Sequence, residues 1–403
     1  MTTHRHKDSR GGYTTYVTDP SLSGLATKTA LAAETTARTT GDAALRASID
    51  DLELRLSALE GPPSEPPPEP PPEPPPDTTR PWPLPVTTRT VTIPASIDAT
   101  GATDVTAALQ AWIDSVPDGS ILAFGGAGKT YKISRRLNLA GRNHLLLEGG
   151  GCTLNNVANG NTDGLGGSYY YAFFFNYWGD AAPSHITIRN FVATAASPAP
   201  GTFQVGEHAC FLYQMQGSYI ELDNITVSGL FGAFMALNNH PTYVWAHDNH
   251  ILNCGANGVA LMASDHVLVE NNTWGPIGYC CVDLEPTSGT TEGNTNIVFR
   301  NNAYSTWDNC FLAINSGNRN TVCTDLEFSN NTVSGSSLLT LATYATANRI
   351  KRLAFTGNRS SVTASAPVIR FAHIDGLTVG SNVQPVSSGS MYSISDCTAV
   401  VGP

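Results

Sequence analysis

A short phrase recurs along the C-terminal half of the chain: apolar and polar residues alternate, and an Asn-containing turn follows. Examples are Ile186–Asn190, Val267–Asn272 and Leu326–Asn331. The second Asn of the turn returns at intervals of 23, 30, 29, 27 and 24 residues, at Asn249, Asn272, Asn302, Asn331, Asn358 and Asn382. A loose period of this length, made of strands and turns, predicts a β-solenoid.

The physics of a solenoid explains this pattern. One coil cannot bury its apolar side alone, so successive coils have to share one core. Parallel strands about 4.8 Å apart bring equivalent residues of neighbouring coils into columns. Asn tolerates the left-handed backbone of a sharp corner, and stacked Asn amides can hydrogen-bond along a column. We therefore interpret the asparagines as corner residues and not as ligands.

Two segments precede the solenoid and follow a first segment, residues 1–27, that has no clear period. Residues 28–60 carry an a/d heptad seam at Leu45, Ile49, Leu52, Leu56 and Leu59, which predicts a coiled coil. The alternative is a single amphipathic helix lying on a domain, but no adjacent globular segment is available to receive it. Residues 61–85 repeat Glu-Pro-Pro-Pro and predict a polyproline II spacer rather than an SH3-type ligand.

Residues 86–403 are predicted to form the solenoid, and its first helix is expected at Asp104–Asp114. Thr103 or Asp104 is the expected N-cap, and Val105, Ala108, Leu109, Trp112 and Ile113 form an apolar face. Such a helix would cover the open first coil, whose strand edges are otherwise unpaired.

Composition excludes several classes of function. The net charge of −11, without a basic cluster, argues against a nucleic-acid partner. No stretch reaches 18 apolar residues, so we expect no membrane span. Residues 1–8 lack the apolar region of a signal peptide. We predict no metal and no other cofactor.

The entry into the solenoid resembles a known superfamily. The run Asp98–Asp114, followed by Pro117–Phe124 and Thr130–Ile133, is similar to the first segments of pectate-lyase-like right-handed parallel β-helices. With a coiled coil and a spacer in front, the chain resembles a bacteriophage tail spike or minor tail protein. This superfamily includes lyases, hydrolases and binders without catalytic activity, so the resemblance specifies the fold more closely than the chemistry.

The resemblance implies a biological context. The chain is expected to be an all-β protein and a homotrimer in the virion tail. Residues 1–27 would attach it to other tail or baseplate proteins. The β-helix would recognise a host-surface polysaccharide during adsorption. Cleavage of that polysaccharide, or a purely structural role in the tail, are the alternatives.

Two short motifs suggest ligands but have simpler explanations. Residues Gly125–Thr130 lack the first Gly of a phosphate-binding loop, because Ala123 stands at that position, and no helix is expected to follow. His247 and His250 fall at a corner with odd spacing, so their side chains should point in different directions. We interpret both motifs as turns.

When the strands that precede each Asn corner are aligned, the apolar residues point inward, and the remaining residues form two columns that point outward. One outward column holds Ala236, Ala260, Asp283, Ala313, Thr340 and Arg370, and the other holds Asn238, Met262, Glu285, Asn315 and Ala372. The small residues should leave a shallow trough in which only one coil carries two carboxylates.

Asp283 and Glu285 are the candidate catalytic residues. As i and i+2 on a strand they leave the same face about 7 Å apart at Cβ, which suits an inverting glycosidase. Asp308 is a candidate third catalytic residue. The candidate glycan contacts are Trp307, which is next to Asp308, and Asn238 and Asn315 of the trough. The alternative is an ordinary solvated strand face.

The aromatic run Tyr169–Trp178 cannot be wholly buried in a strand. Alternate members should fill the core, and the others should contact a glycan or a neighbouring subunit. We select Tyr170 and Phe174 as candidate glycan contacts and leave the two interpretations open.

The eight cysteines are scattered and form no CxxC pair. The alignment stacks Cys280 on Cys310 in neighbouring coils, both facing inward. Because buried thiols behave as small hydrophobic groups, we expect free thiols rather than disulfides.

Overall fold

A computed structural model of the chain describes residues 2–7, 13–18, 28–59, 80–83, 85–158, 172–176, 180–195, 210–214, 216–286, 293–315, 321–343 and 349–398. The chain divides into two units, Met1–Thr79 and Arg80–Pro403. The second unit therefore begins at Arg80 and not at Val86.

The first unit contains a hairpin and a long helix. Strands β1 (Thr2–Lys7) and β2 (Tyr13–Thr18) pair antiparallel, which the sequence pattern did not predict. Helix α1 spans Lys28–Leu59, where the heptads predict a helix. Its assembly into a coiled coil stays a prediction. No helix in the described part of the chain is long and apolar enough to cross a membrane.

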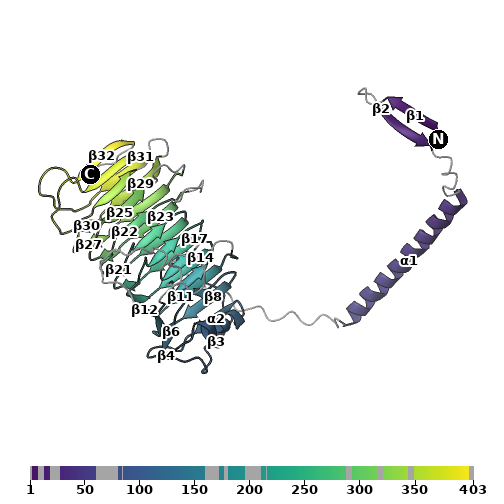
Figure 1. Ribbon diagram of the computed structural model, residues 1–403, viewed down its shortest axis with the longest axis horizontal. Helices are drawn as coiled ribbons and strands as arrows, with labels where there is room; N and C mark the ends of the chain where they lie inside the picture. The colour runs from purple at the N-terminus through teal and green to yellow at the C-terminus, as the bar shows by residue number, and fades with distance from the viewer. Residues whose placement is uncertain are drawn as a thin grey trace. The chain divides into compact units, whose positions relative to one another are not determined.

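The second unit is a stack of parallel strands (Figure 1) arranged on three faces. Face 1 comprises β7 (Leu137–Asn138), β10 (Phe174–Asn176), β13 (Leu212–Gln214), β16 (Met235–Leu237), β19 (Val259–Leu261), β22 (Cys280–Leu284), β25 (Cys310–Asn315) and β28 (Thr340–Thr343). Face 2 comprises β3 (Arg89–Thr92), β5 (Ser120–Ala123), β8 (Asn143–Glu148), β11 (Ser184–Arg189), β14 (Ser218–Asp223), β17 (Thr242–His247), β20 (Asp265–Glu270), β23 (Thr295–Arg300), β26 (Thr324–Ser329) and β29 (Ile350–Thr356). Face 3 comprises β4 (Thr100–Asp104), β6 (Thr130–Ile133), β9 (Thr153–Asn156), β12 (Val192–Ala195), β15 (Thr226–Ser228), β18 (His250–Ile251), β21 (Thr273–Trp274), β24 (Ala303–Tyr304), β27 (Thr332–Val333) and β30 (Arg359–Ser360).

Faces 1 and 2 join at the C-terminal end of the stack. Strand β31 (Ile369–Gly380) pairs with β28 through its first residues and with β29 through its last. Strand β32 (Tyr392–Thr398) then pairs along both parts of β31. The strands make a right-handed parallel solenoid of about 10 turns, which confirms the predicted all-β solenoid.

The core lies between the three faces and is built from equivalent residues of successive coils. Phe211 stacks on Phe234 with ring centroids 5.6 Å apart, and Phe299 stacks on Phe328 at 5.5 Å. All four rings are fully buried. The alternation of apolar and polar residues therefore shows directly which side chains of a strand enter the core.

The corner between faces 2 and 3 holds the asparagines. The first residue of each corner has a left-handed backbone, as at Asn224, Asn271 and Asn301, with φ of 49°, 57° and 57°. The second residue is buried and forms a ladder: Asn272 Nδ2 donates to Asn302 Oδ1 at 3.0 Å and to Ala246 O at 2.9 Å. The interpretation of the asparagines as corner residues is confirmed.

Helix α2 spans Thr106–Ser115, close to the predicted range. Its N-cap is Val105 rather than Thr103 or Asp104, although Asp104 Oδ1 accepts a hydrogen bond from Thr106 N at 2.9 Å. Leu109 and Ile113 are fully buried, and Trp112 packs edge-on against Phe124 at 5.0 Å. That this helix protects the end of the solenoid stays a prediction.

One part of the predicted strand alignment is wrong. Leu312 pairs with Thr340, and Ala313 pairs with Leu341, so the alignment was displaced by one residue at β28. Thr340 is fully buried and donates its hydroxyl to Leu338 O at 2.9 Å, while Leu341 takes the outward position. Because side chains alternate along a strand, a one-residue displacement exchanges the two sides.

Candidate functional site

The outward column of face 1 that contains Asp283 is covered at one end and open to solvent at the other. Ala236 and Ala260 are buried in a second apolar cluster with Ala172, Cys210, Tyr213 and Ala233. The expected trough is therefore not open along these coils. Beyond them Asp283, Ala313 and Leu341 are partly exposed, and Arg370 is exposed. Asp283 lies where the column changes from buried to accessible.

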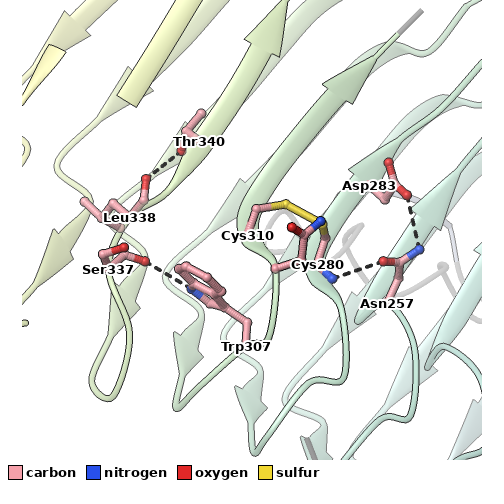
Figure 2. Close-up of a disulfide and its surroundings, with 9 residues drawn as sticks. Asn257, Cys280, Asp283, Trp307, Cys310, Ser337, Leu338 and Thr340 are labelled. Carbon is pink, nitrogen blue, oxygen red and sulfur yellow. Dashed lines mark hydrogen bonds between the residues drawn. A yellow bond between two sulfur atoms is a disulfide. The ribbon is translucent and has the colours of Figure 1, made fainter. Parts of the chain in front are cut away.

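Asp283 is held by an amide from the preceding coil. Asn257, only 2% exposed, donates from Nδ2 to Asp283 Oδ2 at 3.2 Å, and its Oδ1 accepts from Cys280 N at 3.2 Å. Figure 2 shows Asn257 joining Cys280 and Asp283 of strand β22. A hydrogen bond donated to a carboxylate favours its ionised form, so this contact suits a base rather than an acid.

A disulfide joins Cys280 to Cys310 on the next coil (Figure 2). Their stacking was predicted, but the expectation of free thiols was wrong, because parallel pairing brings the two Cα atoms to 4.7 Å, within disulfide range. Both side chains are fully buried, as the expected inward orientation requires. The remaining six cysteines are free thiols.

The other predicted catalytic residues lie close to this point in the sequence but differ in exposure. Glu285 follows β22, is partly exposed and donates its backbone N–H to Leu261 O at 2.9 Å. Asp308 is exposed on the turn before β25, where its N–H donates to Ile277 O at 3.1 Å. The two carboxylates of one coil, Asp283 and Glu285, are thus both accessible in part.

The residues predicted to contact a glycan differ in their burial. Trp307 packs partly buried against the core and donates Nε1–H to Ser337 O at 3.0 Å (Figure 2). Asn238 follows β16 and is partly exposed. Asn315 ends β25, but its side chain lies outside the described part of the structure. Their contact with a glycan stays a prediction.

One residue of the aromatic run, Phe174, is not exposed as predicted. Phe174 is fully buried and packs edge-on against Phe211 with centroids 5.5 Å apart. Its assignment as a glycan contact is wrong, because its side chain is on the core side of β10. Tyr170 lies outside the described residues.

Face 2 carries a second polar site, which the sequence analysis missed. We call Glu221, Asp223, His247 and Asp248 the Glu–His–Asp cluster. His247 Nε2 lies 3.1 Å from Glu221 Oε1, and His247 Nδ1 lies 2.8 Å from Asp248 Oδ2 and 3.7 Å from Asp223 Oδ1. The side chains of Glu221 and His247 are only 7% and 8% exposed.

Burial and hydrogen bonds act in opposite directions on this cluster. Burial alone would raise the pKa of Glu221, but hydrogen bonds from His247 and Thr187 and the Arg80 charge lower it overall. Burial raises the pKa of Asp223, and the nearby Glu221 adds to this effect while His247 opposes it. Burial would lower the pKa of His247, but its hydrogen bonds to Glu221 and Asp248 raise it.

Residues 80–83 extend over this cluster. Arg80 pairs with Glu221, and its guanidinium lies 5.0 Å from the Trp245 ring. Trp82 packs edge-on against Tyr243 at 5.3 Å. Tyr243 belongs to a column of stacked rings at 4.3–4.7 Å spacing, made of His144, His185, Tyr219, Tyr243 and His266. The end of the Pro-rich segment is therefore part of the solenoid surface.

A signal for the Glu–His–Asp cluster was present in the repeated phrase. The last strand residue before each corner forms one outward column of face 2: Glu148, Arg189, Asp223, His247, Glu270, Arg300, Ser329 and Thr356. Most of its members are charged, in a chain with only 14% charged residues. An alignment of the face 1 strands alone does not include this column.

No protein-family profile and no curated protein sequence matches the chain. Among solved structures, the chain is similar to the surface adhesin PfbA of Streptococcus pneumoniae (14% identity, 77% of this chain and 100% of that chain, TM-score 0.46). It is also similar to a polygalacturonase from Erwinia carotovora (11%, 80% and 98%, 0.44) and to a double mutant of the tailspike protein of E. coli bacteriophage HK620 (12%, 76% and 64%, 0.40). With identities and TM-scores this low, function has to be inferred from the residues of the chain itself.

Proposed function

We propose that the chain is a bacteriophage tail attachment protein that recognises a host-surface glycan on face 1 and cleaves it there. The observation that carries the proposal is the carboxylate pair Asp283 and Glu285. Asp283 lies on β22 where the outward column becomes accessible and is held by Asn257, and Glu285 directly follows the end of this strand. The tail context rests on the resemblance of residues 98–133 and on the order of segments along the chain.

A glycan suits the geometry of face 1. Equivalent outward residues repeat every 4.7–4.9 Å along a column of parallel strands, which is close to the length of one pyranose ring. A linear oligosaccharide lying along the column would therefore meet a new coil at each sugar. The outward residues after Asp283 include Ala313, Leu341 and Arg370, which combine small, apolar and charged groups. Such a surface can contact both faces and hydroxyl groups of sugars.

The two carboxylates can have different roles. Asp283 accepts a hydrogen bond from Asn257, which favours the ionised form and suits the group that activates water. Glu285 would then protonate the leaving oxygen. Side chains at i and i+2 on a strand are separated by about 7 Å at Cβ, a spacing from which two carboxyl groups can reach the roughly 6.5–9.5 Å that separates the carboxyl groups of inverting glycosidases. We therefore propose hydrolysis with inversion, with Asp308 as a supporting residue.

Binding without cleavage is the second candidate function, and the partial burial of both carboxylates is equally compatible with it. In that case Asp283 and Glu285 would accept hydrogen bonds from sugar hydroxyls, and Asn238 would donate or accept them. The proposed assembly is the same in both cases: a homotrimer held by α1, attached to other tail proteins through residues 1–27. A purely structural tail component would not need an accessible carboxylate pair.

The test is incubation of the full chain with cell-envelope polysaccharide from candidate hosts, followed by sizing of the polymer and measurement of retained protein. We expect the polymer to shorten. The variant Asp283→Asn/Glu285→Gln should cleave at least about 100-fold more slowly while still adsorbing, because removal of a general acid or base costs 10²–10⁴-fold.

A matched control is Asp265→Asn/Glu327→Gln, which removes two carboxylates from face 2 of the same solenoid. This control should cleave at the parent rate. Retention of protein without shortening of any polymer would favour the binding function. Cleavage by Asp283→Asn/Glu285→Gln at the parent rate would refute the catalytic assignment.

A further inference from the structure

We propose that Asp223, His247 and Asp248 on face 2 bind one first-row divalent cation, Zn²⁺ or Mn²⁺. One ligand atom from each residue lies within 4.8 Å of the others. The three residues come from two adjacent coils, because Asp223 pairs with His247 across strands β14 and β17 and Asp248 follows at the corner. Their donor atoms are one imidazole nitrogen and two carboxylate oxygens. This site is separate from the carboxylate pair on face 1.

The imidazole of His247 is oriented as in a metal site. Its Nε2 lies 3.1 Å from Oε1 of Glu221, and this carboxylate is itself held by Thr187 Oγ1 at 2.7 Å and by Arg80. With a proton on Nε2 this contact is satisfied, and the lone pair of Nδ1 can bind a cation in place of the proton that Nδ1 otherwise shares with Asp248. Metal-binding histidines usually donate their other N–H to such a carboxylate, which fixes the ring.

The two carboxylates around Nδ1 favour a cation between them. Arg80 balances Glu221, whereas Asp223 and Asp248 both face the same imidazole nitrogen. In the same column, Glu148 is balanced by Arg189 at 2.7 Å and Glu270 by Arg300 at 2.7 Å. A divalent ion between the two aspartates would supply the charge that arginine supplies in the neighbouring coils.

Asp248 stands at a corner position where the neighbouring coils carry asparagine. The corners before and after it place Asn224, Asn271, Asn301 and Asn330 in the same left-handed conformation, with φ of 49–57°. Asn fits this backbone well, so the fold alone gives no reason for a carboxylate at position 248, where φ is 53°. The presence of Asp rather than Asn at position 248 places a negatively charged oxygen 2.8 Å from His247 Nδ1.

The donor set favours transition metals over calcium or magnesium. Ca²⁺ and Mg²⁺ prefer oxygen ligands alone, whereas imidazole suits Zn²⁺ and related ions and carboxylates suit Mn²⁺. Asp248 is 58% exposed at its side chain, so water has access to complete the coordination shell. Three protein ligands and an open position are a common zinc arrangement.

The test uses the full chain after treatment with EDTA. Titration with Zn²⁺ followed by calorimetry should give one equivalent per chain, and Mn²⁺ should bind at the same site as judged by loss of its free-ion EPR signal. Mn²⁺ distinguishes this site from the free thiols, because thiolates prefer zinc to manganese. Zn²⁺ should displace the bound Mn²⁺.

The decisive variant is Asp248→Asn, because asparagine is the residue that neighbouring corners already carry and the fold should tolerate it. We expect Asp248→Asn to weaken Mn²⁺ binding at least about tenfold and Asp223→Asn/Asp248→Asn by about 100-fold or more. The matched control Asp265→Asn removes the carboxylate 2.9 Å from His266 Nδ1 on the next coil and should bind as the parent does. Absence of stoichiometric binding, or unchanged binding by Asp223→Asn/Asp248→Asn, would overturn the proposal.

This outcome is independent of the proposed function. Glycan cleavage by Asp283→Asn/Glu285→Gln and metal binding by Asp248→Asn are measured separately. If glycan cleavage is not observed, metal binding is still tested by Asp248→Asn, and the reverse also holds.

Discussion

Adjacent residues of the corner between faces 2 and 3 have different roles. Asn301 is exposed and adopts the left-handed conformation, with φ of 57°. Asn302 is 1% exposed and belongs to the ladder: Nδ2 donates to Val269 O at 2.9 Å, and Oδ1 accepts from Asn272 N at 3.1 Å. The first residue thus makes the turn, and the second satisfies buried backbone groups of neighbouring coils.

We predict that Asn302→Ala lowers the free energy of unfolding by about 3 kcal/mol, because it leaves buried N–H and C=O groups without partners. Asn301→Gly should change it much less, because glycine also adopts positive φ. Urea unfolding of both variants measures the difference. Equal effects at the two positions would contradict these separate roles.

The residue scale also shows what a sequence pattern can miss. His247 was interpreted as a turn residue because only its spacing to His250 was considered. In the structure His250 is exposed on β18, while His247 lies against Glu221 and stacks on Trp245 with centroids 3.6 Å apart. Two of its partners, Glu221 and Asp223, come from the previous coil, which no local spacing reveals.

At the scale of elements, residues 80–83 behave as part of the solenoid. The side chain of Arg80 is 20% exposed and pairs with Glu221, whose side chain is 7% exposed. Breaking a buried pair by removing one partner is costly, because the other charge stays buried. The spacer therefore ends on face 2 before the first strand begins.

We predict that Arg80→Ala lowers the free energy of unfolding of the solenoid by about 3 kcal/mol. Arg352→Ala, which removes an exposed partner of Asp325 on face 2, is the control and should have little effect. Thermal unfolding of the full chain measures both. Similar melting temperatures for Arg80→Ala and the parent would show that the contact does not stabilise the unit.

The disulfide is a second feature of the elements, since it links β22 to β25. Of the eight cysteines, we predict that six react with a thiol reagent in denaturant before reduction and eight after it. Closing a loop with a sequence separation of 30 should stabilise the fold by about 3–4 kcal/mol. Cys280→Ser/Cys310→Ser should lose this stability. Eight reactive thiols before reduction would disprove the bond.

At the scale of the whole molecule, the exposed seam of α1 favours assembly. Leu45 is 62% exposed and Ile49 is 46% exposed in the single chain. Apolar residues repeating at a and d positions are buried when helices associate. The solenoid has no such requirement, because its coils already share a core.

We therefore predict that the full chain sediments as a trimer and that Leu45→Asp/Ile49→Asp sediments as a monomer. A charge at a and d opposes helix association. The control Asp50→Ala removes an exposed charge of the same helix that lies outside the a and d positions, and it should leave the trimer intact. A monomeric full chain would contradict the proposed coiled coil.

The sequence by itself determined the solenoid, the position of α2 and the long helix α1. Each rests on a local pattern: alternation within a strand, an Asn corner, or a helical repeat. The strand alignment also placed Asp283 and Glu285 outward and stacked Cys280 on Cys310. These contacts follow from the repeat once equivalent residues are aligned.

The tertiary structure decided what the repeat leaves open. Coil lengths vary from 23 to 30 residues across the Asn ladder, so the apolar pattern alone does not give the correct register at Thr340. Burial of Ala236 and Ala260, the disulfide and the Glu–His–Asp cluster all depend on contacts between coils. Such contacts are set by the pairing of strands far apart in sequence, and a displacement of one residue reverses which side chains meet.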